Sequence, residues 1–440
     1  MKLLLGALLV IVSAAWALNL LVTGGGSGGS LPWVIRQEAL YISGLLSIAL
    51  MSLAMFLSTR PAWLERPLGG MDRIYRAHKW AGILAVGFAV LHWLIEEIVG
   101  DILKAMIGRG GRIPKEKDSG FLEVMRDLAE DMGEWAFYVV LVMLAITLWK
   151  RFPYKTWRIT HQAMPVIYLM LAFHAIFLAP TDYWTKPVGI LLALFLAGGV
   201  YGSLHSLVGR IGRKRQVNGV VTAIEKPSRD VLTVSCQLDN SWRGHRPGQF
   251  AFISFDEKEG AHPFTIASAD RGDRTITLQI KALGDYTRVL GNRLEIGRSV
   301  KVEGPYGRFD MARQDAHAQQ IWIAGGIGVT PFLAWLDSLQ GKPRQISAEL
   351  HYCTRDRTSD PFVARLESSC ASLSGIRLHI HGAQQGETLS ATSVASTQDG
   401  SRRSEIWFCG PPGLAEKLKH GLRSLGHNKF SFHQEAFEMR

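Results

Sequence analysis

Long apolar runs in the first half of the chain constrain its fold more than any other feature. Up to about residue 208 there are six of them, at roughly 3–22, 39–57, 79–99, 134–149, 163–179 and 187–207. About twenty apolar residues in a helix span the hydrocarbon core of a bilayer. Since backbone polar groups find no water there, only helices and closed barrels can cross it. The first half is therefore expected to form a six-helix transmembrane bundle.

Basic residues cluster beside these runs and predict the topology. The clusters are Arg60, Arg66, Arg73, Arg76 and Lys79, then Lys150, Arg151, Lys155 and Arg158, then Arg210, Arg213, Lys214 and Arg215. By the positive-inside rule, all three clusters face the cytoplasm. The net charge of +11 thus indicates a lipid membrane as partner, and no nucleic acid. We expect a multi-pass protein of the inner or plasma membrane whose second half is cytoplasmic, where its four cysteines form no disulfide framework.

The first run has two interpretations. Residues 1–17 resemble a signal peptide, with Lys2, an apolar core and a small-residue end at Ala15 to Ala17. The apolar stretch continues to Val22, however, which is long enough to cross the membrane. An uncleaved first span is favoured, and the topology of the remaining spans is the same in both cases.

Four histidines lie inside two of the apolar runs. His78 and His92 are fourteen residues apart in the third run, and His161 and His174 are thirteen apart in the fifth. Ionisable side chains in a membrane span are costly, and imidazole is a frequent axial ligand of haem iron. We therefore predict two haem groups at two depths, one bound by His78 and His161 and the other by His92 and His174. A compact metal site is the competing functional hypothesis.

The two spacings differ in what they require of the helix. Fourteen residues give about 21 Å of rise and return to within about 40° of the same helix face. Thirteen residues miss it by about 140°. A straight fifth helix would therefore not align His161 with His174, and Pro165 is predicted to distort it. Tyr168, between these two histidines, either packs between the haems or belongs to the ordinary core.

The segment from about Gly100 to Met132 is the longest one outside the membrane. Phe121, Met125, Leu128 and Met132 recur at helical spacing, so they form either a short amphipathic helix on the outer surface or an early start of the fourth span. Glu96, Glu97 and Asp101 lie just beyond His92, at the end of the third run. They are either a solvated helix end or a patch that attracts a cationic acceptor.

The second half alternates between polar and apolar residues, as in a globular domain. Short strands without an intervening helix are expected at Val220–Ile224, Val231–Leu238, Gln249–Phe255, Thr275–Ile280 and Ser299–Val302, which predicts an antiparallel β-barrel. From about Gln319 the pattern changes to strand, glycine turn and helix. The strands Ile321–Ala324, Ala348–Cys353, Ile376–Ile380 and Ile406–Phe408 then predict an α/β domain with a parallel sheet.

Nearly the whole chain resembles the family of NADPH oxidases and ferric reductases, in which a six-helix haem domain is fused to a flavin and nicotinamide module of the ferredoxin reductase type. The similarity rests on the two histidine pairs and on motifs in the family's order: Arg246 to Phe250, His262 to Ser268, Gly284 to Thr287, Gly304 to Gly307, Gly325 to Pro331 and Phe408 to Pro412. It implies a transmembrane haem domain at 1–209, an FAD-binding β-barrel at 210–312 and an NAD(P)-binding α/β domain at 313–440.

The resemblance also implies roles for individual residues. FAD would be bound by His262, Pro263, Phe264, Thr265, Ser268, Gly284, Asp285 and Thr287. The nicotinamide dinucleotide would be bound by Gly325, Gly326, Gly328, Thr330, Pro331, Gly410 and Pro411, with Arg355 favouring NADPH over NADH because a planar guanidinium suits a phosphate. Cys409 and Glu435 would lie at the hydride-transfer site, and Phe437 would stack on the flavin. The sequence departs from the family's ending by three further residues, Glu438 to Arg440.

These implications give one leading function and two alternatives. The leading hypothesis is an oxidoreductase that passes electrons from cytosolic NADPH through FAD and two haem b groups to dioxygen, giving superoxide, or to a ferric chelate on the outer face. The alternative is an electron-donating subunit for a periplasmic or membrane protein. In a third hypothesis the helices merely anchor a cytosolic flavin reductase.

Overall fold

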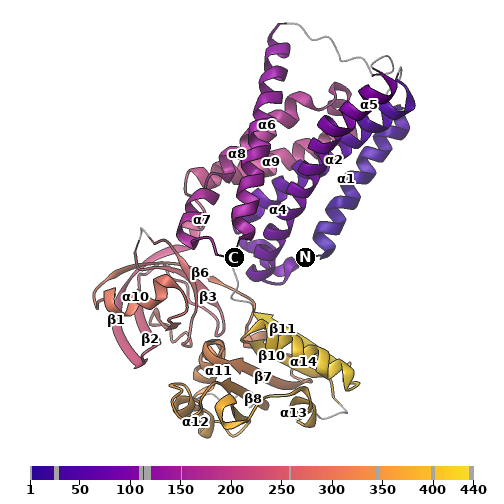
Figure 1. Cartoon of the computed structure of the whole chain (residues 1–440). Coiled ribbons are helices and arrows are strands. Elements are labelled where there is room, and N and C mark those ends of the chain that lie inside the picture. Colours follow the sequence, from indigo (N-terminus) through magenta and orange to yellow (C-terminus); the bar gives the residue numbers. More distant parts are fainter. Residues whose placement is uncertain are drawn as a thin grey trace. The chain divides into compact units, whose positions relative to one another are not determined.

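The computed structural model describes residues 2–23, 29–108, 112, 120–149, 151–256, 259–341, 346–397 and 402–435. The chain divides into two compact units, and Figure 1 labels most of their helices and strands. The helical unit comprises Met1–Leu68 and Arg73–Ile211, and the sheet unit comprises Gly69–Asp72 and Gly212–Arg440. Each unit is considered separately below.

The helical unit contains the six expected spans. Within the described residues, six helical segments are long and apolar enough to cross a membrane: α1 (Lys2–Thr23), α2 (Leu31–Ser58), Met71–Ile107, α6 (Phe121–Leu148), Lys155–Leu178 and α9 (Pro187–Leu207). Short helical turns η1 (Ala62–Leu64), α3 (Glu65–Leu68) and η3 (Thr181–Thr185) connect them. The predicted multi-pass architecture is confirmed.

The third span consists of three consecutive helical pieces. Helix α4 (Met71–Leu94) passes into a π-helical turn, η2 (Ile95–Val99), and continues as α5 (Gly100–Ile107). A π-turn inserts one extra residue per turn and often marks a functional position in a helix. Here it begins three residues after His92, one of the four membrane histidines.

The fourth span starts early. Helix α6 runs without a break from Phe121 to Leu148, so Phe121 to Met132 form its first turns rather than a separate surface helix. At 1.5 Å per residue its 28 residues extend for about 42 Å, more than the roughly 30 Å of a hydrocarbon core. Many side chains in its first half are exposed.

The fifth span is broken, as the histidine spacing requires. Helix α7 (Tyr154–His161) ends at His161, and α8 (Met164–Leu178) begins three residues later with Pro165 in its first turn. Around the break the backbone N–H of Ala163 donates to Thr160 and that of Val166 donates to Ala163, both at 3.0 Å. These tighter i to i−3 bonds change the winding of the helix, which is the distortion predicted from the sequence.

Small and aromatic residues close the core of the helical unit. The Tyr168 hydroxyl lies 2.8 Å from Ser52 Oγ on α2, and a Cβ at Gly199 of α9 would lie 2.1 Å from Tyr168 Oη. Tyr168 is fully buried. Small residues let membrane helices approach closely. Tyr168 therefore belongs to the ordinary core between α2, α8 and α9, the second of the two interpretations above.

The first part of the sheet unit is a six-stranded antiparallel barrel. Its strands are β1 (Gln216–Ser228), β2 (Val231–Leu238), β3 (Phe250–Ser254), β4 (His262–Thr265), β5 (Thr275–Lys281) and β6 (Ser299–Tyr306), in the order β4-β3-β6-β1-β2-β5. A bridge between Ile266, just after β4, and Leu278 of β5 joins the two ends of the sheet. Buried side chains such as Val221, Val234 and Ile253 fill the interior.

One expectation for this barrel was wrong. A helix, α10 (Asp285–Arg293), lies between β5 and β6, where strands without an intervening helix were predicted. Its start is fixed locally, since the N–H groups of Leu283 and Gly284 both donate to Thr287 Oγ1, at 3.1 and 3.0 Å. Side-chain bonds of this kind satisfy backbone groups that the first turn of a helix leaves open.

The second part of the sheet unit is a parallel α/β domain. Strands β7 (Gln319–Gly325), β8 (Ala348–Thr354), β9 (Ile376–Gly382), β10 (Ser404–Cys409) and β11 (Phe430–Glu435) form a sheet of order β11-β10-β7-β8-β9, with all pairs parallel. Helices α11 (Thr330–Leu339) and α12 (Val363–Ala371) pack on one face, and α13 (Ala391–Ser396) and α14 (Pro412–Ser424) pack on the other. The predicted fold class, a helical membrane bundle followed by a barrel and an α/β domain, is confirmed.

Candidate functional site

The four membrane histidines form two facing pairs. The ring centroids of His78 and His161 are 6.2 Å apart with an interplanar angle of 81°, and those of His92 and His174 are 6.3 Å apart at 80°. These are the pairs expected from sequence. In each pair one ring comes from α4 and the other from the α7–α8 span, so the break in that span brings both of its histidines to the same partner helix.

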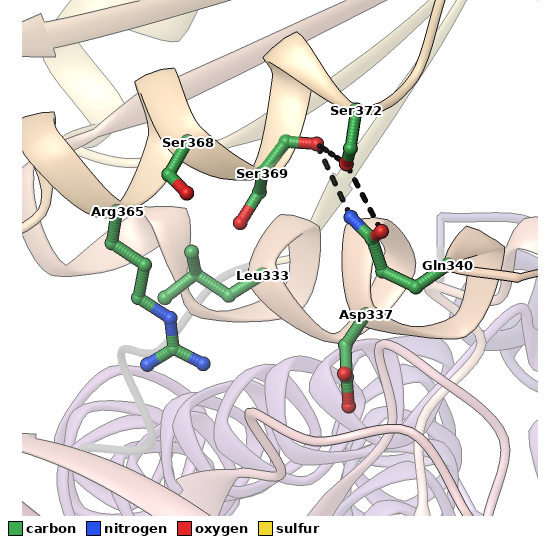
Figure 2. Close-up of a pocket in the computed structure, with 7 residues that line it drawn as sticks. All are labelled: Leu333, Asp337, Gln340, Arg365, Ser368, Ser369 and Ser372. Atoms are coloured by element: carbon green, nitrogen blue, oxygen red, sulfur yellow. Dashed lines mark hydrogen bonds between the residues drawn. The ribbon is translucent and has the colours of Figure 1, made fainter.

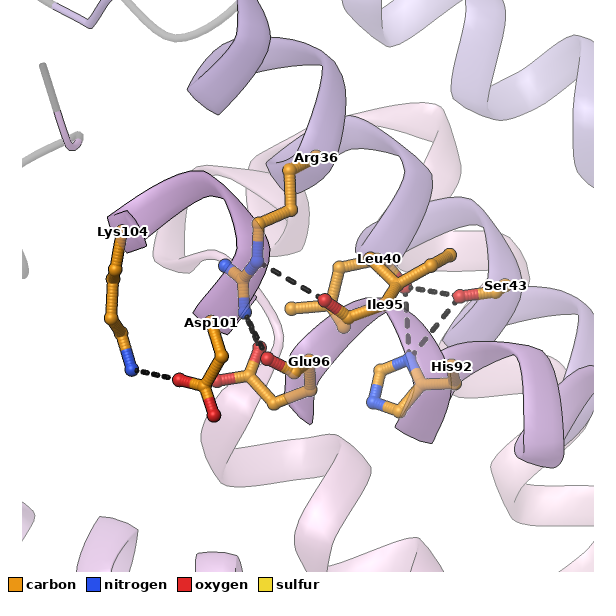
Figure 3. Close-up of polar contacts among 8 residues, drawn as sticks. All are labelled: Arg36, Leu40, Ser43, His92, Ile95, Glu96, Asp101 and Lys104. Carbon is orange, nitrogen blue, oxygen red and sulfur yellow. Dashed lines mark hydrogen bonds and ion pairs between the residues drawn. The ribbon is translucent and has the colours of Figure 1, made fainter. Parts of the chain in front are cut away.

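Backbone carbonyl groups of α2 orient both histidines of α4. His78 Nδ1 lies 2.8 Å from the Ala54 oxygen, and His92 Nδ1 lies 3.0 Å from the Leu40 oxygen. A carbonyl oxygen only accepts, so Nδ1 of each ring carries the hydrogen and Nε2 keeps its lone pair for a metal. Figure 3 shows His92 between Leu40 and Ser43, whose Oγ lies 3.3 Å from the same nitrogen.

The two partner histidines are held differently. His174 Nδ1 lies 2.8 Å from the Ala129 oxygen of α6, which gives it the same tautomer. His161 stacks on Trp157 at 5.1 Å and 21°, and its buried Nδ1 has no hydrogen-bond partner among the described residues. The Trp157 indole donates to Thr147 Oγ1 of α6 at 3.0 Å, which fixes the ring on which His161 stacks.

Two glycines leave room for the rings of the His92 and His174 pair. A Cβ at Gly133 would lie 2.0 Å from His174 Nδ1, a distance that no real contact allows, and a Cβ at Gly44 would lie 3.1 Å from the His92 ring. Both glycines are in helix interiors, where glycine is otherwise unfavourable by about 1 kcal/mol relative to alanine. Glycine therefore occurs at these two helix positions, despite its lower helix propensity, because a larger residue would collide with a histidine ring.

The pair geometry fits haem iron. If both imidazoles of a pair bound one iron atom, with metal–nitrogen bonds of about 2 Å and ring centres roughly 1 Å beyond each nitrogen, their centroids would lie about 6 Å apart. Both pairs match this separation. Among the described residues no group of three or more His, Cys, Asp or Glu side chains is arranged to hold a metal ion, so the competing compact metal site finds no support.

The acidic residues beyond His92 are partly neutralised. Arg36 of α2 is buried and donates to the carbonyl oxygens of Ile95 at 3.1 Å and Glu96 at 2.9 Å, and its Nη2 lies 2.5 Å from the Glu96 carboxylate. Asp101 accepts from Lys104 at 2.7 Å. Figure 3 shows these contacts around η2. Two of the three acidic residues are thus paired, which favours a solvated helix end over a patch for cationic acceptors.

The proposed flavin motif forms β4 and the turn after it. His262 and Tyr286 of α10 stack at 4.4 Å and 11°, while Pro263 and Phe264 pair with Phe252 and Ala251 of β3. The Thr265 hydroxyl and the Tyr286 hydroxyl are buried without a hydrogen-bond partner among the described residues. Burial raises the pKa of Tyr286 to about 12, with Asp256 and Glu259 adding to the shift. Buried polar atoms in native structures are normally paired, so these two hydroxyls fit a bound polar molecule such as FAD.

Other predicted flavin residues have structural contacts. Ser268 Oγ accepts from the Thr277 backbone N–H at 3.1 Å, which holds the turn after β4. Gly284 is the N-cap residue of α10, Asp285 is exposed in its first turn, and Thr287 caps it. The motif residues thus come from one end of β4 and from the start of α10.

The glycine loop after β7 packs against the end of β10. A Cβ at Gly328 would lie 2.2 Å from the Cys409 oxygen, and a Cβ at Gly325 would lie 2.6 Å from Pro411 Cδ. Gly410 is similarly close to Gly325. Gly326 differs, because its φ of +55° suits glycine and nothing lies within 4 Å of its Cβ position. Close packing thus explains three of these glycines, and Gly326 alone leaves backbone open to a ligand.

The start of α11 completes this loop. Thr330 and Pro331 form its first turn, and Thr330 Oγ1 donates to the Ile327 oxygen at 2.6 Å. This bond closes the 3-10 turn η6 (Gly326–Val329) onto the helix. The N-terminus of a helix in this position favours a negatively charged ligand.

Cys409 and Glu435 are neighbours on adjacent strands. They pair in the register of β10 with β11, and both are buried. Burial raises the pKa of the Cys409 thiol well above its ordinary value, and the Glu435 carboxylate adds to the shift. A Cβ at Gly307 would lie 3.0 Å from Glu435 Oε1 and 3.1 Å from the Phe250 ring, so the flavin barrel and the nucleotide domain meet here. Phe437 lies outside the described residues.

Arg355 is exposed immediately after β8. It lies at the carboxyl edge of the parallel sheet, where dinucleotides bind in folds of this kind. Its backbone oxygen accepts from Gln384 N–H at 2.9 Å, which joins the loops after β8 and β9.

Sequence reasoning missed the groups that orient the histidines. The carbonyl groups of Leu40, Ala54 and Ala129 belong to apolar residues with no side-chain signal. Gly44 and Gly133 are visible as glycines within apolar helices, but only their distance from a histidine ring explains them.

Family models match two parts of the chain. Residues 43–172 match the ferric reductase like transmembrane component, and residues 217–310 match an FAD-binding domain. Respiratory burst oxidase homolog protein E of Arabidopsis thaliana is 25% identical over 226 residues, which are 45% of this chain and 23% of that protein. The chain belongs to the ferric reductase and NADPH oxidase family. It is thus a membrane flavin oxidoreductase, and its FAD domain and pyridine-nucleotide reductase fold support transmembrane electron transfer.

The chain is also similar to components of other reductase systems. The anthranilate 1,2-dioxygenase electron transfer component of Acinetobacter baylyi is 24% identical over 234 residues, covering 50% of this chain and 67% of that protein. A flavohemoglobin from Malassezia yamatoensis, solved with bound FAD and heme, has a TM-score of 0.50 at 15% identity, covering 93% of this chain and 100% of that one. The latter likeness concerns the fold alone. The chain spans about two thirds of the length of the reductase relatives.

Proposed function

We propose that this protein carries electrons from cytosolic NADPH through FAD and two haem groups to an acceptor on the outer face of the membrane. The acceptor is dioxygen, which becomes superoxide, or chelated ferric iron. Nicotinamide gives up two electrons as a hydride, whereas both of these acceptors take one at a time. Bound FAD supplies the conversion between the two, and bound haem supplies one-electron carriers within the membrane.

The observation that carries this proposal is the separation of the facing imidazoles, 6.2 and 6.3 Å in two independent pairs. A helix anchor for a cytosolic reductase would need no such pairs. The Nδ1 bonds of His78, His92 and His174 to carbonyl groups leave each Nε2 free for iron, as haem ligation requires. Basic clusters at the helix ends support a cytoplasmic sheet unit by the positive-inside rule.

In the sheet unit, we assign two roles to the site residues: they bind FAD and the nucleotide, and they keep negative charge away from the path of the hydride. The Thr265 and Tyr286 hydroxyls are available to FAD, and the open backbone at Gly326 is available to the nucleotide phosphates. Cys409 stays a neutral thiol because of its raised pKa, so it places no negative charge where a hydride must pass. We infer that the exposed guanidinium of Arg355 favours NADPH over NADH, because a planar guanidinium suits a 2′-phosphate.

A difference spectrum of the purified protein tests the haem proposal. We expect reduction to produce the sharp bands of low-spin, six-coordinate haem, with two haems per FAD. Absence of these bands from protein that retains FAD contradicts the proposal and leaves a membrane-anchored flavin reductase.

The acceptor is tested by following NADPH consumption under air, under argon and under argon with ferric citrate. Dye reduction in air that superoxide dismutase suppresses supports dioxygen. Activity under argon only with ferric citrate supports ferric reduction. Failure in all three conditions by protein with reducible haem excludes both small acceptors.

A second candidate function is electron donation to a basic protein on the outer face. The observation that favours it is the length of α6, whose exposed first half carries Glu123, Asp127, Glu130, Asp131 and Glu134. Ala129, whose oxygen orients His174, lies within this segment. Protein acceptors bound through such charges dissociate as ionic strength rises. An outer-face protein that restores NADPH consumption at low salt but not at high salt would support this candidate.

A further inference from the structure

Helix α11 connects the nucleotide domain to the flavin barrel at two places. The Trp335 indole donates to the Pro247 carbonyl oxygen at 3.0 Å, next to Gly248, whose φ of +93° lets the chain pass against Phe309. Two residues further along the helix, Asp337 contacts a second barrel loop. Nine of the ten helix residues are buried and only Asp337 is partly exposed. Because it is packed on nearly all of its faces, this helix cannot shift easily, and the position of one end therefore determines the position of the other.

Asp337 makes two bonds to the segment that follows the flavin motif. Its Oδ2 accepts from the Ala269 backbone N–H at 2.8 Å, and its Oδ1 accepts from Arg271 Nη2 at 2.7 Å. Ala269 is buried, so its N–H depends on this carboxylate. The preceding residue, Ser268, holds the turn after β4, which carries Thr265. Asp337 therefore fixes the backbone four residues beyond Thr265.

The other end of α11 belongs to the nucleotide site. Thr330 and Pro331 follow the glycine loop that packs on Cys409, beside Glu435. A ten-residue helix is about 15 Å long. One rigid element thus begins at the nicotinamide loop and ends at the flavin segment, and the bonds of Asp337 are its attachment to the latter.

The C-terminal end of α11 is also tied to its own domain. Gln340 Nε2 donates to the Ser369 oxygen at 3.2 Å, and Ser372 Oγ donates to Gln340 Oε1 at 3.0 Å. Figure 2 shows these bonds beside a cavity of about 440 Å³ that is also bordered by Asp337 and Arg365.

We propose that Asp337 is a positioning residue for hydride transfer, which sets the separation of the flavin-binding and nicotinamide-binding segments through α11. The inference rests on the proposed use of FAD and NADPH. The step it affects breaks the C4–H bond of the dihydronicotinamide and moves the hydride to the flavin, so that NADPH is oxidised and FAD is reduced. Hydride transfer depends steeply on donor–acceptor distance, and misplacement by about 1 Å can cost on the order of 100-fold.

An ordinary surface ion pair predicts something different. The side chains of Arg271 and Asp337 are 70% and 19% exposed, so their attraction alone contributes little to stability. An ordinary pair would change the thermal stability slightly and leave the chemical step alone. The matched control is Glu367, which pairs with Arg357 at 3.5 Å within the nucleotide domain and does not reach the barrel.

The experiment is anaerobic stopped-flow reduction of FAD in the full-length protein by NADPH and by NADPH deuterated at C4. For Asp337→Ala we expect a limiting rate of flavin reduction lowered at least tenfold, unchanged FAD content and an isotope effect as large as in the wild type. Arg271→Gln should lower the rate about threefold, and Glu367→Gln should not change it. Exchanging the charges with Arg271→Asp and Asp337→Arg should recover part of the rate lost by Asp337→Arg alone.

Several results would overturn the inference. One is a wild-type limiting rate of FAD reduction in Asp337→Ala. Another is a slower rate in this variant that returns to the wild-type value when NADPH is saturating or FAD is added. If Asp337→Ala does not fold, a wild-type rate in Arg271→Gln has the same consequence, since the exposed Arg271 side chain is not needed for the core. A wild-type protein whose FAD is not reduced by NADPH would instead contradict the proposed function.

Discussion

Gly133 of α6 lies against the imidazole of His174, so that a Cβ at this position would be 2.0 Å from Nδ1. The same nitrogen is 2.8 Å from the Ala129 oxygen one turn earlier. Helix α6 therefore both orients this ring and makes room for it.

Gly133→Ala should displace the His174 ring and weaken binding of the haem that we propose it shares with His92. Loss of an orienting contact typically costs 10- to 100-fold in metal affinity. We expect the haem-to-FAD ratio of the purified variant to fall from about two towards about one. Gly198→Ala is the control, since nothing lies within 4 Å of its Cβ position. Equal haem content in both variants would contradict the placement of His174.

Substitution of either member of a facing pair should remove the same haem. His78→Ala and His161→Ala should each lose one haem, and the double variant should lose no more than either single variant, because the two residues act as one site. His78→Ala combined with His92→Ala should lose both haems. Haem content and the reduced spectrum provide the measurement, and additive loss from His78 and His161 would refute the pairing.

Arg355→Ala should change the choice of nucleotide. Removing one charge-assisted contact to a phosphate costs about 1.4 kcal/mol or more, so kcat/KM for NADPH should fall about tenfold while that for NADH changes little. Arg365→Ala provides the control, because Arg365 is an exposed arginine on α12. Equal losses with both nucleotides would argue against a 2′-phosphate contact.

The sheet unit should lose stability in mild acid through His351. This imidazole is buried beside His379 and His381, and burial followed by the charges of these two neighbours lowers its pKa to about 3. Below pH 6.5 the unfolded chain binds a proton that the folded chain does not. The free energy of unfolding therefore falls as the pH falls from 6.5 towards 3, by about 2 kcal/mol at pH 5.

Thermal release of FAD between pH 7 and pH 5 measures this effect. His351→Gln should flatten the pH dependence of the release temperature, whereas substitution of the exposed His317 by Gln should leave it as in the wild type. A variant with the wild-type slope would show that other groups are responsible.

All four cysteines should resist alkylation in the native protein. Burial raises the pKa of Cys236 and Cys353 to about 12 and that of Cys370 to about 11, and burial together with Glu435 raises the pKa of Cys409 well above its ordinary value. Since the thiolate is the reactive form, iodoacetamide at pH 8 should modify none of them until the protein is unfolded, when all four should react. Rapid modification of Cys236, Cys370 or Cys409 in the native protein would disprove the burial of that side chain.

The sequence predicted the parts of this fold that side chains encode. The apolar runs became spans, Val231–Leu238 is a strand with unchanged bounds, and the thirteen-residue spacing of His161 and His174 required the break that occurs at Gln162 and Ala163. Each of these signals is a pattern of residue types with a known period.

Other features of the fold and the site could not be predicted, because they depend on backbone hydrogen bonds or on contacts between residues far apart in the sequence. Helix α10 was missed because its start is stabilised by bonds from the backbone N–H groups of Leu283 and Gly284 to Thr287 Oγ1 rather than by an apolar period. The early start of α6 could not be distinguished from a separate helix, because both place Phe121 and Met125 on one face. The carbonyl groups that orient His78 and His92 belong to Ala54 and Leu40, whose side chains indicate nothing about them.

Leu40 and Ala54 are fourteen residues apart on α2, the same interval that separates His92 from His78 on α4. The two carbonyl groups of α2 therefore match the two histidines of α4 in spacing. A shift of α2 along α4 that breaks the contact of one histidine also breaks the contact of the other. One residue inserted between Leu40 and Ala54 would rotate one carbonyl group by about 100° and shift it by about 1.5 Å relative to the other. In related proteins, insertions or deletions in this part of α2 should consequently be accompanied by equal changes between the two histidines of α4.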